Sequence, residues 1–325
     1  AVLAGLSTNC EISGFSKFDR KTYFYPDLPK AYQISQFDKP ICKNGFIEVQ
    51  SPAGPKKIRL NRIHLEEDAG KNIHSNNASQ SVSYVDLNRT GVPLIEIVTE
   101  PDISSADEAY EYLSSLKKIL RYIAVSDCNM EEGSLRCDVN ISLKPKGADK
   151  LGDKVEIKNM NSFKAVKAAI EYEQKRQQNK LEDKEKISQE TRLWDPDSGK
   201  TMPMRSKEDS HDYRYFPDPD LPPVCVDEAY IEARRSELPE LPAAKYHRFR
   251  NDFALPHLDA DVLTSSRTLA DYYEQTLALG ADAKKAANWI DNEVLAIIPD
   301  AEDARTFPVS AAALAELIAL IDKNV

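Results

Sequence analysis

The chain has 325 residues, of which 43 are Lys or Arg and 53 are Asp or Glu, so its formal net charge is −10. That acidity argues against a protein that coats nucleic acid, because such proteins carry an excess of basic residues. With 41% hydrophobic and 30% charged residues, the composition is typical of a folded globular protein. The apolar stretches are far shorter than the ~20 residues that span a bilayer, and no leader opens the chain, so we expect a cytoplasmic protein without a membrane partner.

In chain order, residues 1–6 resemble the interior of a helix, and residues 15–225 carry strand signals broken by Pro, Gly and Asn. Two helices are predicted among these strands, one over residues 105–122 with a capping box at its start and one over residues 162–180. The predicted strands are residues 58–60, 93–100, 134–143 and 155–157. This mixture lacks a regular βαβ rhythm and therefore favours an α+β fold.

The strand predicted at residues 134–143 alternates strictly between apolar and polar side chains. Its polar face presents Arg136, Asp138 and Asn140, a cation, an anion and an amide on one surface. A solvated face is the ordinary explanation, because antiparallel sheets often leave one side in water. A functional surface is the alternative.

No common nucleotide or hydrolase motif is present, since G-x-G-x-x-G, H-E-x-x-H and G-x-S-x-G are all missing. Residues 198–201 resemble the end of a phosphate-binding P-loop, but Trp194 stands where that motif needs a glycine. We expect a hairpin turn there, between strands at residues 189–194 and 201–205. The five cysteines include no C-x-x-C pair and are predicted to be reduced thiols.

Residues 227–325 read as one amphipathic helix after another. The predicted helices are residues 227–237, 243–251, 266–279, 282–298 and 310–321. The Pro-rich run Leu238–Pro242 is the natural joint before most of them. We therefore predict an α+β domain over residues 1–237 and an all-α helical domain over residues 238–325.

Several carboxylates occupy unusual positions. Glu66, Glu67 and Asp68 follow an apolar-alternating strand, which either ends that strand in solvent or offers oxygen atoms to Mg²⁺. Glu96 shares its predicted strand face with Leu94 and with an apolar residue two positions later, where an ionised group needs a cation or a hydrogen-bond partner. A salt bridge and a metal ion explain Glu96 about equally well.

Basic residues lie among tyrosines in two aromatic loops of similar sequence. Lys21 and Lys30 flank the first loop, which contains Tyr23 and Tyr25, and Arg205 lies before the second. Scattered surface bases are common, yet this pattern also suits a phosphate and a stacked base. His64 and His74 lack helical ligand spacing, so we interpret both as structural or solvent-facing.

Six segments together resemble the GatB subunit of the tRNA-dependent amidotransferase family. They are residues 16–36, 64–71, 85–96, 130–142, 156–159 and 212–217. The resemblance implies an antiparallel-sheet cradle similar to the glutamine synthetase and guanido kinase fold, followed by a helical domain. It implies that ATP phosphorylates the side-chain carboxylate of Glu-tRNA(Gln) or Asp-tRNA(Asn) and that ammonia then displaces the phosphate. The implied partners are the misacylated tRNA, an amidase subunit that releases the ammonia, and a small third subunit that completes a heterotrimer.

The resemblance also assigns roles to residues of this chain. Metal ligands of the family match Glu67 and Glu96, with Glu66 close by, so Mg²⁺ joins ATP as an expected cofactor. The phosphate-binding candidates, chosen by their charge and their place in matched segments, are Lys21, Lys30, Arg136 and Arg205. The candidates for binding the rest of the nucleotide are Tyr23, Tyr25 and Asp138.

Two departures from the family pattern lead us to expect a fragment that is inactive alone. The family's opening Gly-Leu-Glu-Val-His segment, whose His and Glu complete the metal site, is missing, and so is the tail domain that binds the tRNA elbow. A scaffold protein without kinase chemistry is one alternative. A two-subunit, Gln-only relative is another, but its inserted domain would need a spare ~100-residue segment, and the chain has none.

Overall fold

The computed structural model describes residues 1–51, 54–74, 82–148, 150–204, 212–298 and 306–323. The chain folds into two compact units. The first unit comprises residues 1–115 and 128–237, and the second comprises residues 116–127 and 238–325. Residues 116–127 thus group with the C-terminal helices, although the chain passes through them between two parts of the first unit. The predicted domain boundaries themselves stay a prediction.

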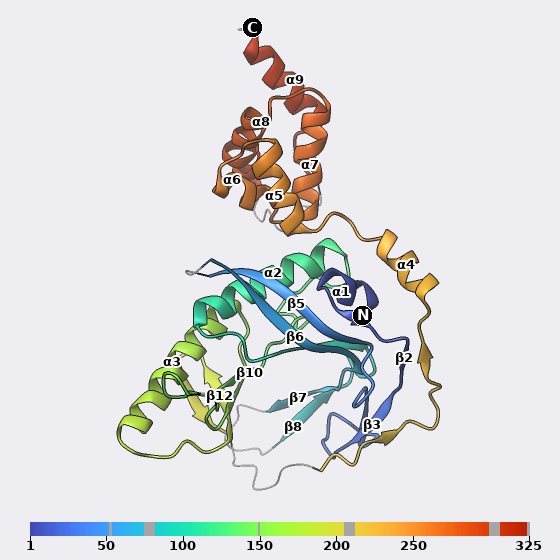
Figure 1. Ribbon diagram of the computed structural model, residues 1–325, viewed down its shortest axis with the longest axis vertical. Helices are drawn as coiled ribbons and strands as arrows, with labels where there is room; N and C mark the ends of the chain where they lie inside the picture. The colour runs from blue at the N-terminus through green and yellow to red at the C-terminus, as the bar shows by residue number, and fades with distance from the viewer. Residues whose placement is uncertain (52–53, 75–81, 149, 205–211, 299–305, 324–325) are drawn as a thin grey trace. The chain divides into compact units, whose positions relative to one another are not determined.

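The largest sheet of the first unit holds four antiparallel strands in the order β1-β5-β6-β9. Figure 1 labels its two long central strands, β5 and β6, which lie side by side. They are β1 (Glu11–Ile12), β5 (Cys42–Ser51), β6 (Gly54–Glu67) and β9 (Pro93–Thr99). In the first half of β6, Ile58 and Leu60 are buried while Lys57 and Arg59 are exposed. This alternation places one face of the sheet on the core.

A β-bulge interrupts that alternation. The pairing of β6 with β9 shifts by one residue between Leu60 and Arg62, which leaves Asn61 as the extra residue. The fully buried side chains are Ile58 and Leu60 before the bulge and Ile63 after it. The core face therefore passes from even-numbered to odd-numbered residues, and the even-numbered residues after the bulge turn to the other face.

Two of the three small sheets bring the two aromatic loops together. One has the order β14-β3-β4, and the others pair β15 with β2 and β7 with β8, all antiparallel. Their bounds are β2 (Phe15–Ser16), β3 (Asp19–Thr22), β4 (Tyr32–Ser35), β7 (Lys71–His74), β8 (Ser83–Asp86), β14 (Phe216–Pro217) and β15 (Val224–Cys225). Because β14 and β15 return to β3 and β2, the second aromatic loop lies beside the first.

A second four-stranded sheet has the order β10-β11-β12-β13. It consists of β10 (Val139–Ile141), β11 (Val155–Lys158), β12 (Glu190–Asp195) and β13 (Lys200–Pro203). The predicted hairpin is confirmed as β12 and β13, with Gly199 at φ +62° in its turn. β11 and β12 run parallel and are joined through α3 (Phe163–Glu182), so the fold does contain one βαβ unit.

The strand predicted at residues 134–143 is shorter than expected, because only Val139–Ile141 pair with a neighbouring strand. The alternation of burial nevertheless continues back to Leu135. Before Val139 the backbone is shaped by Asn129, whose carbonyl accepts the N–H of Ser134 at 2.8 Å. After that turn, residues 135–138 alternate in burial like a strand but form no backbone ladder with a neighbouring strand among the described residues.

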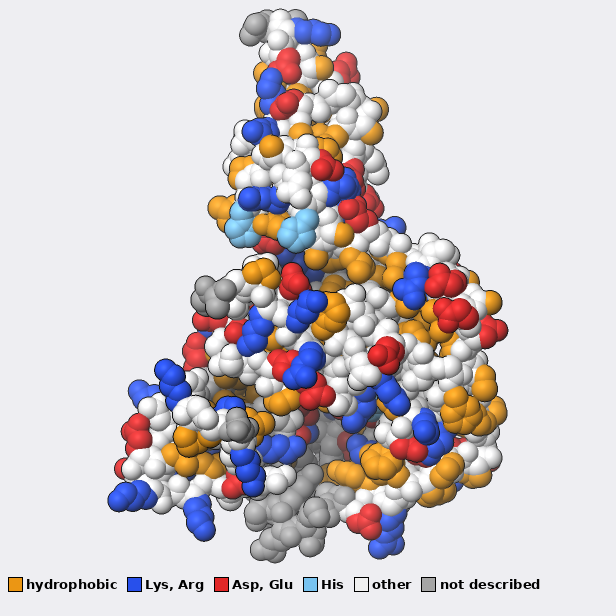
Figure 2. Space-filling model, in the orientation of Figure 1, with side chains coloured by type: hydrophobic (Ala, Val, Ile, Leu, Met, Phe, Trp, Pro, Cys, Tyr) orange, Lys and Arg blue, Asp and Glu red, His pale blue; other side chains and the backbone are white. Residues whose placement is uncertain are grey.

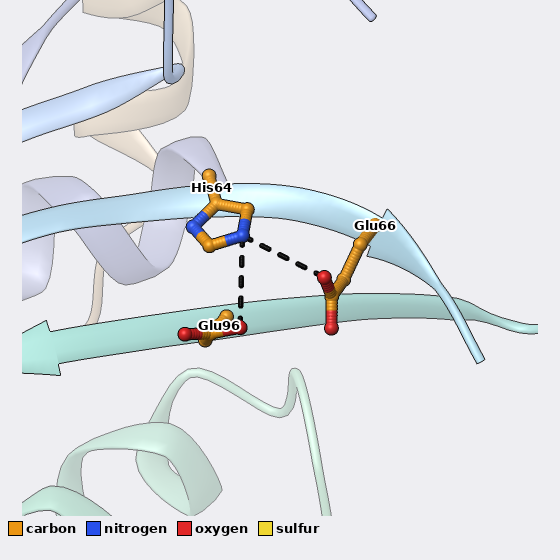
Figure 3. Close-up of side chains that lie close together, drawn as sticks. All are labelled: His64, Glu66 and Glu96. Carbon is orange, nitrogen blue, oxygen red and sulfur yellow. Dashed lines mark ion pairs between the residues drawn. The ribbon is translucent and has the colours of Figure 1, made fainter. Parts of the chain in front are cut away.

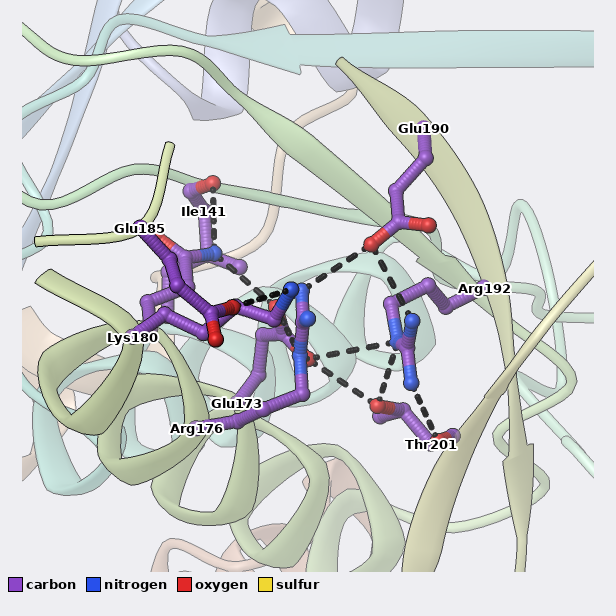
Figure 4. Close-up of polar contacts among 9 residues, drawn as sticks. Ile141, Glu173, Arg176, Lys180, Glu185, Glu190, Arg192 and Thr201 are labelled. Atoms are coloured by element: carbon purple, nitrogen blue, oxygen red, sulfur yellow. Dashed lines mark hydrogen bonds and ion pairs between the residues drawn. The ribbon is translucent and has the colours of Figure 1, made fainter. Parts of the chain in front are cut away.

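A buried polar network joins α3 to β12 and β13 (Figure 4). Glu173 is fully buried and accepts hydrogen bonds from Arg176 at 2.6 Å, Gln177 at 3.0 Å and Thr201 at 2.9 Å. Arg192 of β12 donates to the Thr201 side chain at 2.8 Å. Burial by itself would raise the pKa of the Glu173 carboxyl, but these hydrogen bonds outweigh it and hold that pKa below the ordinary value.

The helices predicted within and after the first unit's strands are confirmed. They are α1 (Val2–Ser7), α2 (Ala106–Tyr122), α3 and α4 (Glu228–Ser236). Ser162 and Asp227 cap α3 and α4 by accepting backbone N–H groups. At α2, the Ser105 hydroxyl accepts a hydrogen bond from the Glu108 N–H, as in the predicted capping box. The Glu108 carboxylate accepts from the N–H of Ser104, where a capping box would have the N–H of Ser105.

The second unit is built from helices around one apolar core. They are α5 (Pro242–Asp252), α6 (His257–Leu263), α7 (Arg267–Ala278), α8 (Ala283–Trp289), a π-helical turn η1 (Ile290–Val294), a 3₁₀ turn η2 (Leu295–Ile297) and α9 (Ala311–Asp322). Phe249, Tyr273, Ile290 and Leu314 lie at the centre of that core. α6 was not predicted, because its seven residues are too few to show a helical period.

The α+β prediction is therefore confirmed at the level of antiparallel sheets followed by a helical region, while likeness to the glutamine synthetase and guanido kinase fold stays a prediction. Of the helices that the structure describes, each is too short or too polar to cross a bilayer.

Candidate active site

An imidazole and two carboxylates meet on the sheet β1-β5-β6-β9. They lie on the face opposite the one that buries Ile58, Leu60 and Ile63. His64 on β6 is directly opposite Glu96 on β9, and Glu66 follows His64 by two residues on the same face. Figure 3 shows the three side chains converging from the two strands. We call His64, Glu66 and Glu96 the acidic cluster.

The acidic cluster has the dimensions of a cation site. His64 Nε2 lies 3.6 Å from Glu66 Oε2 and 3.7 Å from Glu96 Oε2, and one potential ligand atom of each residue lies within 4.8 Å of the others. His64 is 4% exposed, whereas the Glu96 side chain is 49% exposed. The cluster is thus closed on the His64 side and reaches solvent through Glu96.

These positions bear on two interpretations made from sequence. Glu96 shares its strand face with Leu94 and Val98 as predicted, and the facing strand supplies Arg62, His64 and Glu66 to the same face as polar neighbours. The solvent-facing alternative for His64 is wrong, since His64 lies buried beside the two carboxylates, and the structural alternative stays a prediction. The spacing of His64 and Glu66, two apart on a strand, could have shown that they share a face. The side chain of His74 is outside the described residues.

A hydrogen bond from Arg62 determines how His64 can act. Arg62 Nε donates to His64 Nδ1 at 3.2 Å. A neutral imidazole that accepts at Nδ1 carries its proton on Nε2, the atom that faces the carboxylates. A metal ion at Nε2 would require the proton on Nδ1 instead. As arranged, the Nε2–H of His64 faces Glu66 and Glu96 at 3.6 and 3.7 Å, and the carboxylate oxygens are the groups left to bind a cation.

Glu67 lies outside the acidic cluster. Side-chain alternation turns it away from Glu66, and its Oε1 accepts the backbone N–H of Ile34 at 2.8 Å. The same carboxylate forms an ion pair with Lys30, whose ammonium lies 4.6 Å from the centre of the Tyr32 ring. The role of Glu67 as a metal ligand stays a prediction.

The next residue, Asp68, binds Arg136. Arg136 Nη2 donates to Asp68 Oδ1 at 2.6 Å. Because Asp68 directly follows β6 and is two residues after Glu66, this bond brings Arg136, a phosphate-binding candidate, to the end of β6. Asp138 accepts from Lys158 at 2.8 Å. Arg205 lies outside the described residues.

A row of aromatic rings links the two aromatic loops. The rings of Tyr25, Tyr23, Tyr213 and Tyr215 follow one another edge-on at 6.0 Å, and Tyr215 stacks on Phe37 at 4.2 Å. The Lys21 ammonium lies 4.9 Å from the Tyr213 ring centre. Sequence reasoning did not single out Tyr213, Tyr215 or Phe37, although the similarity of the two loops was a signal for the tyrosines.

The charge of the acidic cluster affects the ionisation of the aromatic row. Burial raises the pKa of Tyr215 to about 12, helped by Tyr213 and by the negative charges of Glu66 and Glu96. Burial also raises the pKa of Tyr23 to about 12, with Asp27 and Glu66 adding to it. Carboxylates, a lysine and stackable rings thus occupy one region of the first unit, which suits a nucleotide and a divalent cation.

Comparison with known proteins gives a consistent result. The model of the GatB/GatE catalytic domain matches residues 1–232. A protein of Leptospira biflexa is 54% identical over 327 residues, covering 100% of this chain and 67% of its own length. Proteins of Caldanaerobacter subterraneus and Trichlorobacter lovleyi are 53% and 54% identical, covering 100% and 99% of this chain and 68% and 67% of their own lengths. Each of the three is named as the B subunit of an aspartyl/glutamyl-tRNA(Asn/Gln) amidotransferase.

Proposed function

The chain belongs to the GatB/GatE catalytic-domain family, and from that membership we propose that it forms the amide bond in an aspartyl/glutamyl-tRNA(Asn/Gln) amidotransferase. It is a carbon–nitrogen ligase that acts on misacylated Glu-tRNA(Gln) or Asp-tRNA(Asn) in an ATP-dependent reaction. The observation that carries this conclusion is the match of residues 1–232 to the family's catalytic domain.

The chemistry proceeds in two steps, because ammonia cannot displace oxide from a carboxylate. An oxygen of the side-chain carboxylate first attacks the γ-phosphorus of ATP, and ADP leaves with the electrons of the broken P–O bond. Ammonia then attacks the carbonyl carbon of the acyl phosphate and loses a proton, and inorganic phosphate leaves. Both steps concentrate negative charge on phosphate oxygens, so positioning and charge neutralisation are the main tasks of the protein.

The acidic cluster fits Mg²⁺ through its carboxylates. Mg²⁺ prefers oxygen ligands and is commonly held by one or two carboxylates together with phosphates and water. Glu66 and Glu96 supply such oxygens, while the Arg62 hydrogen bond to Nδ1 leaves the Nε2–H of His64 facing them. Bound there, the ion would neutralise phosphate charge. Glu67, paired with Lys30, is proposed as a further ligand on the family resemblance alone.

The lysines and tyrosines of this region are the groups proposed to bind the nucleotide. Lys21 lies against the ring of Tyr213 and Lys30 against the ring of Tyr32, where their ammonium groups can reach phosphate oxygens. Tyr23 and Tyr25 are proposed to stack with the base. Two further proposals, Arg205 as a phosphate ligand and Asp138 as a nucleotide contact, rest on the family resemblance.

The partners proposed for this protein are the misacylated tRNA, an amidase subunit that releases ammonia and a small third subunit. Figure 2 shows Lys and Arg side chains interspersed with Asp and Glu over the face in view. With a net charge of −10, contact with tRNA would depend on local basic groups more than on a uniformly basic surface.

The test replaces Glu96 by Gln in the assembled amidotransferase. Loss of one carboxylate ligand should weaken Mg²⁺-dependent ATP cleavage at least tenfold while tRNA affinity stays within twofold, because the proposed role of Glu96 is to hold the metal ion and not the tRNA. The control is Glu48→Gln, an exposed carboxylate of β5 in the same sheet. Unchanged ATP cleavage in Glu96→Gln across a magnesium titration would contradict the proposed metal site.

A further inference from the structure

Three segments of the first unit meet at one buried carboxylate, Asp68. Its Oδ2 accepts from Arg89 Nε at 3.0 Å and its Oδ1 from Arg136 Nη2 at 2.6 Å. The Asp68 side chain is 4% exposed, whereas those of Arg89 and Arg136 are 42% and 55% exposed. One carboxylate balances only one of the two guanidinium groups, so the group as a whole carries a positive charge that faces solvent.

The backbone holds this arrangement in place. The Asp68 N–H donates to the Val92 carbonyl at 2.8 Å, and the Gly91 N–H donates to the Asp68 carbonyl at 2.9 Å. Arg89 Nη1 also donates to the carbonyl of Glu132 at 3.1 Å, which joins the third segment. Gly133 follows at φ +78°, and a Cβ placed on it would lie 3.3 Å from Arg89 Nη1. Only a glycine satisfies both constraints without strain.

The group at Asp68 differs from the network around Glu173 in the exposure of its arginines. There the carboxylate is also buried, but its arginines, Arg176 and Arg192, are only 14% and 10% exposed. At Asp68 the carboxylate is buried while both guanidinium groups stay accessible. In the described part of the chain, Arg136 makes a single hydrogen bond, to Asp68, which leaves its other N–H groups for a ligand.

We propose that Arg89 and Arg136, fixed by Asp68, form a clamp for the polyphosphate of the nucleotide. Planar guanidinium groups bind phosphate through paired N–H donors, and a fixed pair loses little conformational entropy on binding. Asp68 is two residues beyond Glu66, so the clamp lies at the same strand end as the proposed metal ligands. Asp68 is a positioning residue, because it acts through the two arginines. This inference rests on the proposed function and adds Arg89 and Asp68 to it.

The test compares Arg89→Gln and Arg136→Gln with Arg59→Gln in the assembled amidotransferase. Arg59 lies on β6 before the bulge and forms an ion pair with Asp102 at 2.7 Å, so it serves as a matched control. The readouts are KM and kcat for ATP, equilibrium binding of ADP without magnesium, tRNA affinity and Tm. Loss of a charge-assisted contact should weaken ADP binding and raise KM for ATP roughly ten- to hundredfold in each variant, with tRNA affinity within twofold. Arg89→Lys should recover only part of the loss, because lysine lacks the guanidinium fork.

Asp68→Asn tests the positioning role. If Asp68 acts through the arginines, its effect on ADP binding should be strongly non-additive with Arg89→Gln, whereas Asp102→Asn should leave ADP binding unchanged. Weaker tRNA binding with normal ADP binding would assign the arginines to phosphodiester groups of tRNA and overturn the proposal. A fall in Tm with normal ADP binding and KM would make the group purely structural and overturn it as well. Failure of the proposed function is distinguishable, because the unmodified complex would then show no tRNA-dependent ATP cleavage.

Discussion

Replacing Glu173 by Gln should destabilise the first unit strongly. The substitution keeps the shape of the side chain but removes the one anion that, among the described residues, reaches both Arg176 and Thr201. It leaves the mostly buried guanidinium groups of Arg176 and Arg192 with Glu190 as their remaining carboxylate, at 3.1 and 3.0 Å. Breaking a buried ion pair by removing one partner costs about 3–5 kcal/mol. Because glutamine still offers one acceptor oxygen, we expect about 3 kcal/mol, or a Tm lowered by about 6–12 °C for a unit of this size.

Tryptophan fluorescence during urea unfolding measures this loss. The chain contains two tryptophans, and Trp194 is buried on β12 next to the network. Replacing Trp289 of the second unit by Phe leaves Trp194 as the reporter of the first. The control is Glu171→Gln, an exposed residue of the same helix, which should change the free energy of unfolding by less than about 0.5 kcal/mol. A loss below about 1 kcal/mol for Glu173→Gln would refute the reasoning.

The pH dependence gives the same prediction a second readout. The pKa of Glu173 lies below its ordinary value of 4.5 in the folded protein, so the unfolded chain takes up a proton first as the pH falls. The stabilisation by Glu173 is therefore complete above the unfolded pKa and is lost as the pH falls through the folded pKa. The difference between the original chain and Glu173→Gln should be constant near neutral pH and shrink in acid.

Three single substitutions probe other parts of the molecule. Burial, with a smaller contribution from Asp259, raises the pKa of Asp291 from 3.8 to about 7, so the folded state loses stability as the pH rises between those values. Asp291→Asn removes this effect. The Tm of the variant minus the Tm of the original chain, measured by calorimetry, should therefore increase from pH 4 to pH 7. Gly133→Ala forces a side chain into a left-handed conformation and should lower stability by about 1 kcal/mol and raise KM for ATP. Ser162→Ala removes the cap of α3 and should cost about 1 kcal/mol in urea unfolding.

The sequence predicted elements wherever local signals agreed with the fold. Strand β9 and helix α3 were found because alternation or a capping residue marks them. Strand β5 was not predicted, and its middle contains Asn44-Gly45, a pair that is typical of hairpin turns. In the structure Asn44 adopts φ +54° inside the strand, and a Cβ on Gly45 would collide with Cys10 Sγ. The glycine allows a close approach of backbone, which only the tertiary structure reveals.

The candidate site was predicted in part. Glu66 and Glu96 were recognised as unusual carboxylates, but their meeting with His64 depends on the register between β6 and β9. Register is decided by pairing across strands that are distant in sequence, and a shift of one residue changes which side chains share a face. Local periodicity could have placed His64 and Glu66 on one face and Glu67 on the other, but it could not show that Glu96 faces His64 across the two strands.

The extra residue at Asn61 divides β6 into two stretches with opposite side-chain phase. Mutations in the first stretch can remodel the hydrophobic interior without rotating His64 or Glu66, as long as the length of the strand is kept. A one-residue deletion there would be far more harmful than most substitutions, since it would drive His64 and Glu66 toward the interior and expel Ile63 from it. Tolerance to substitution combined with intolerance to changes in length should therefore be the mutational signature of this strand.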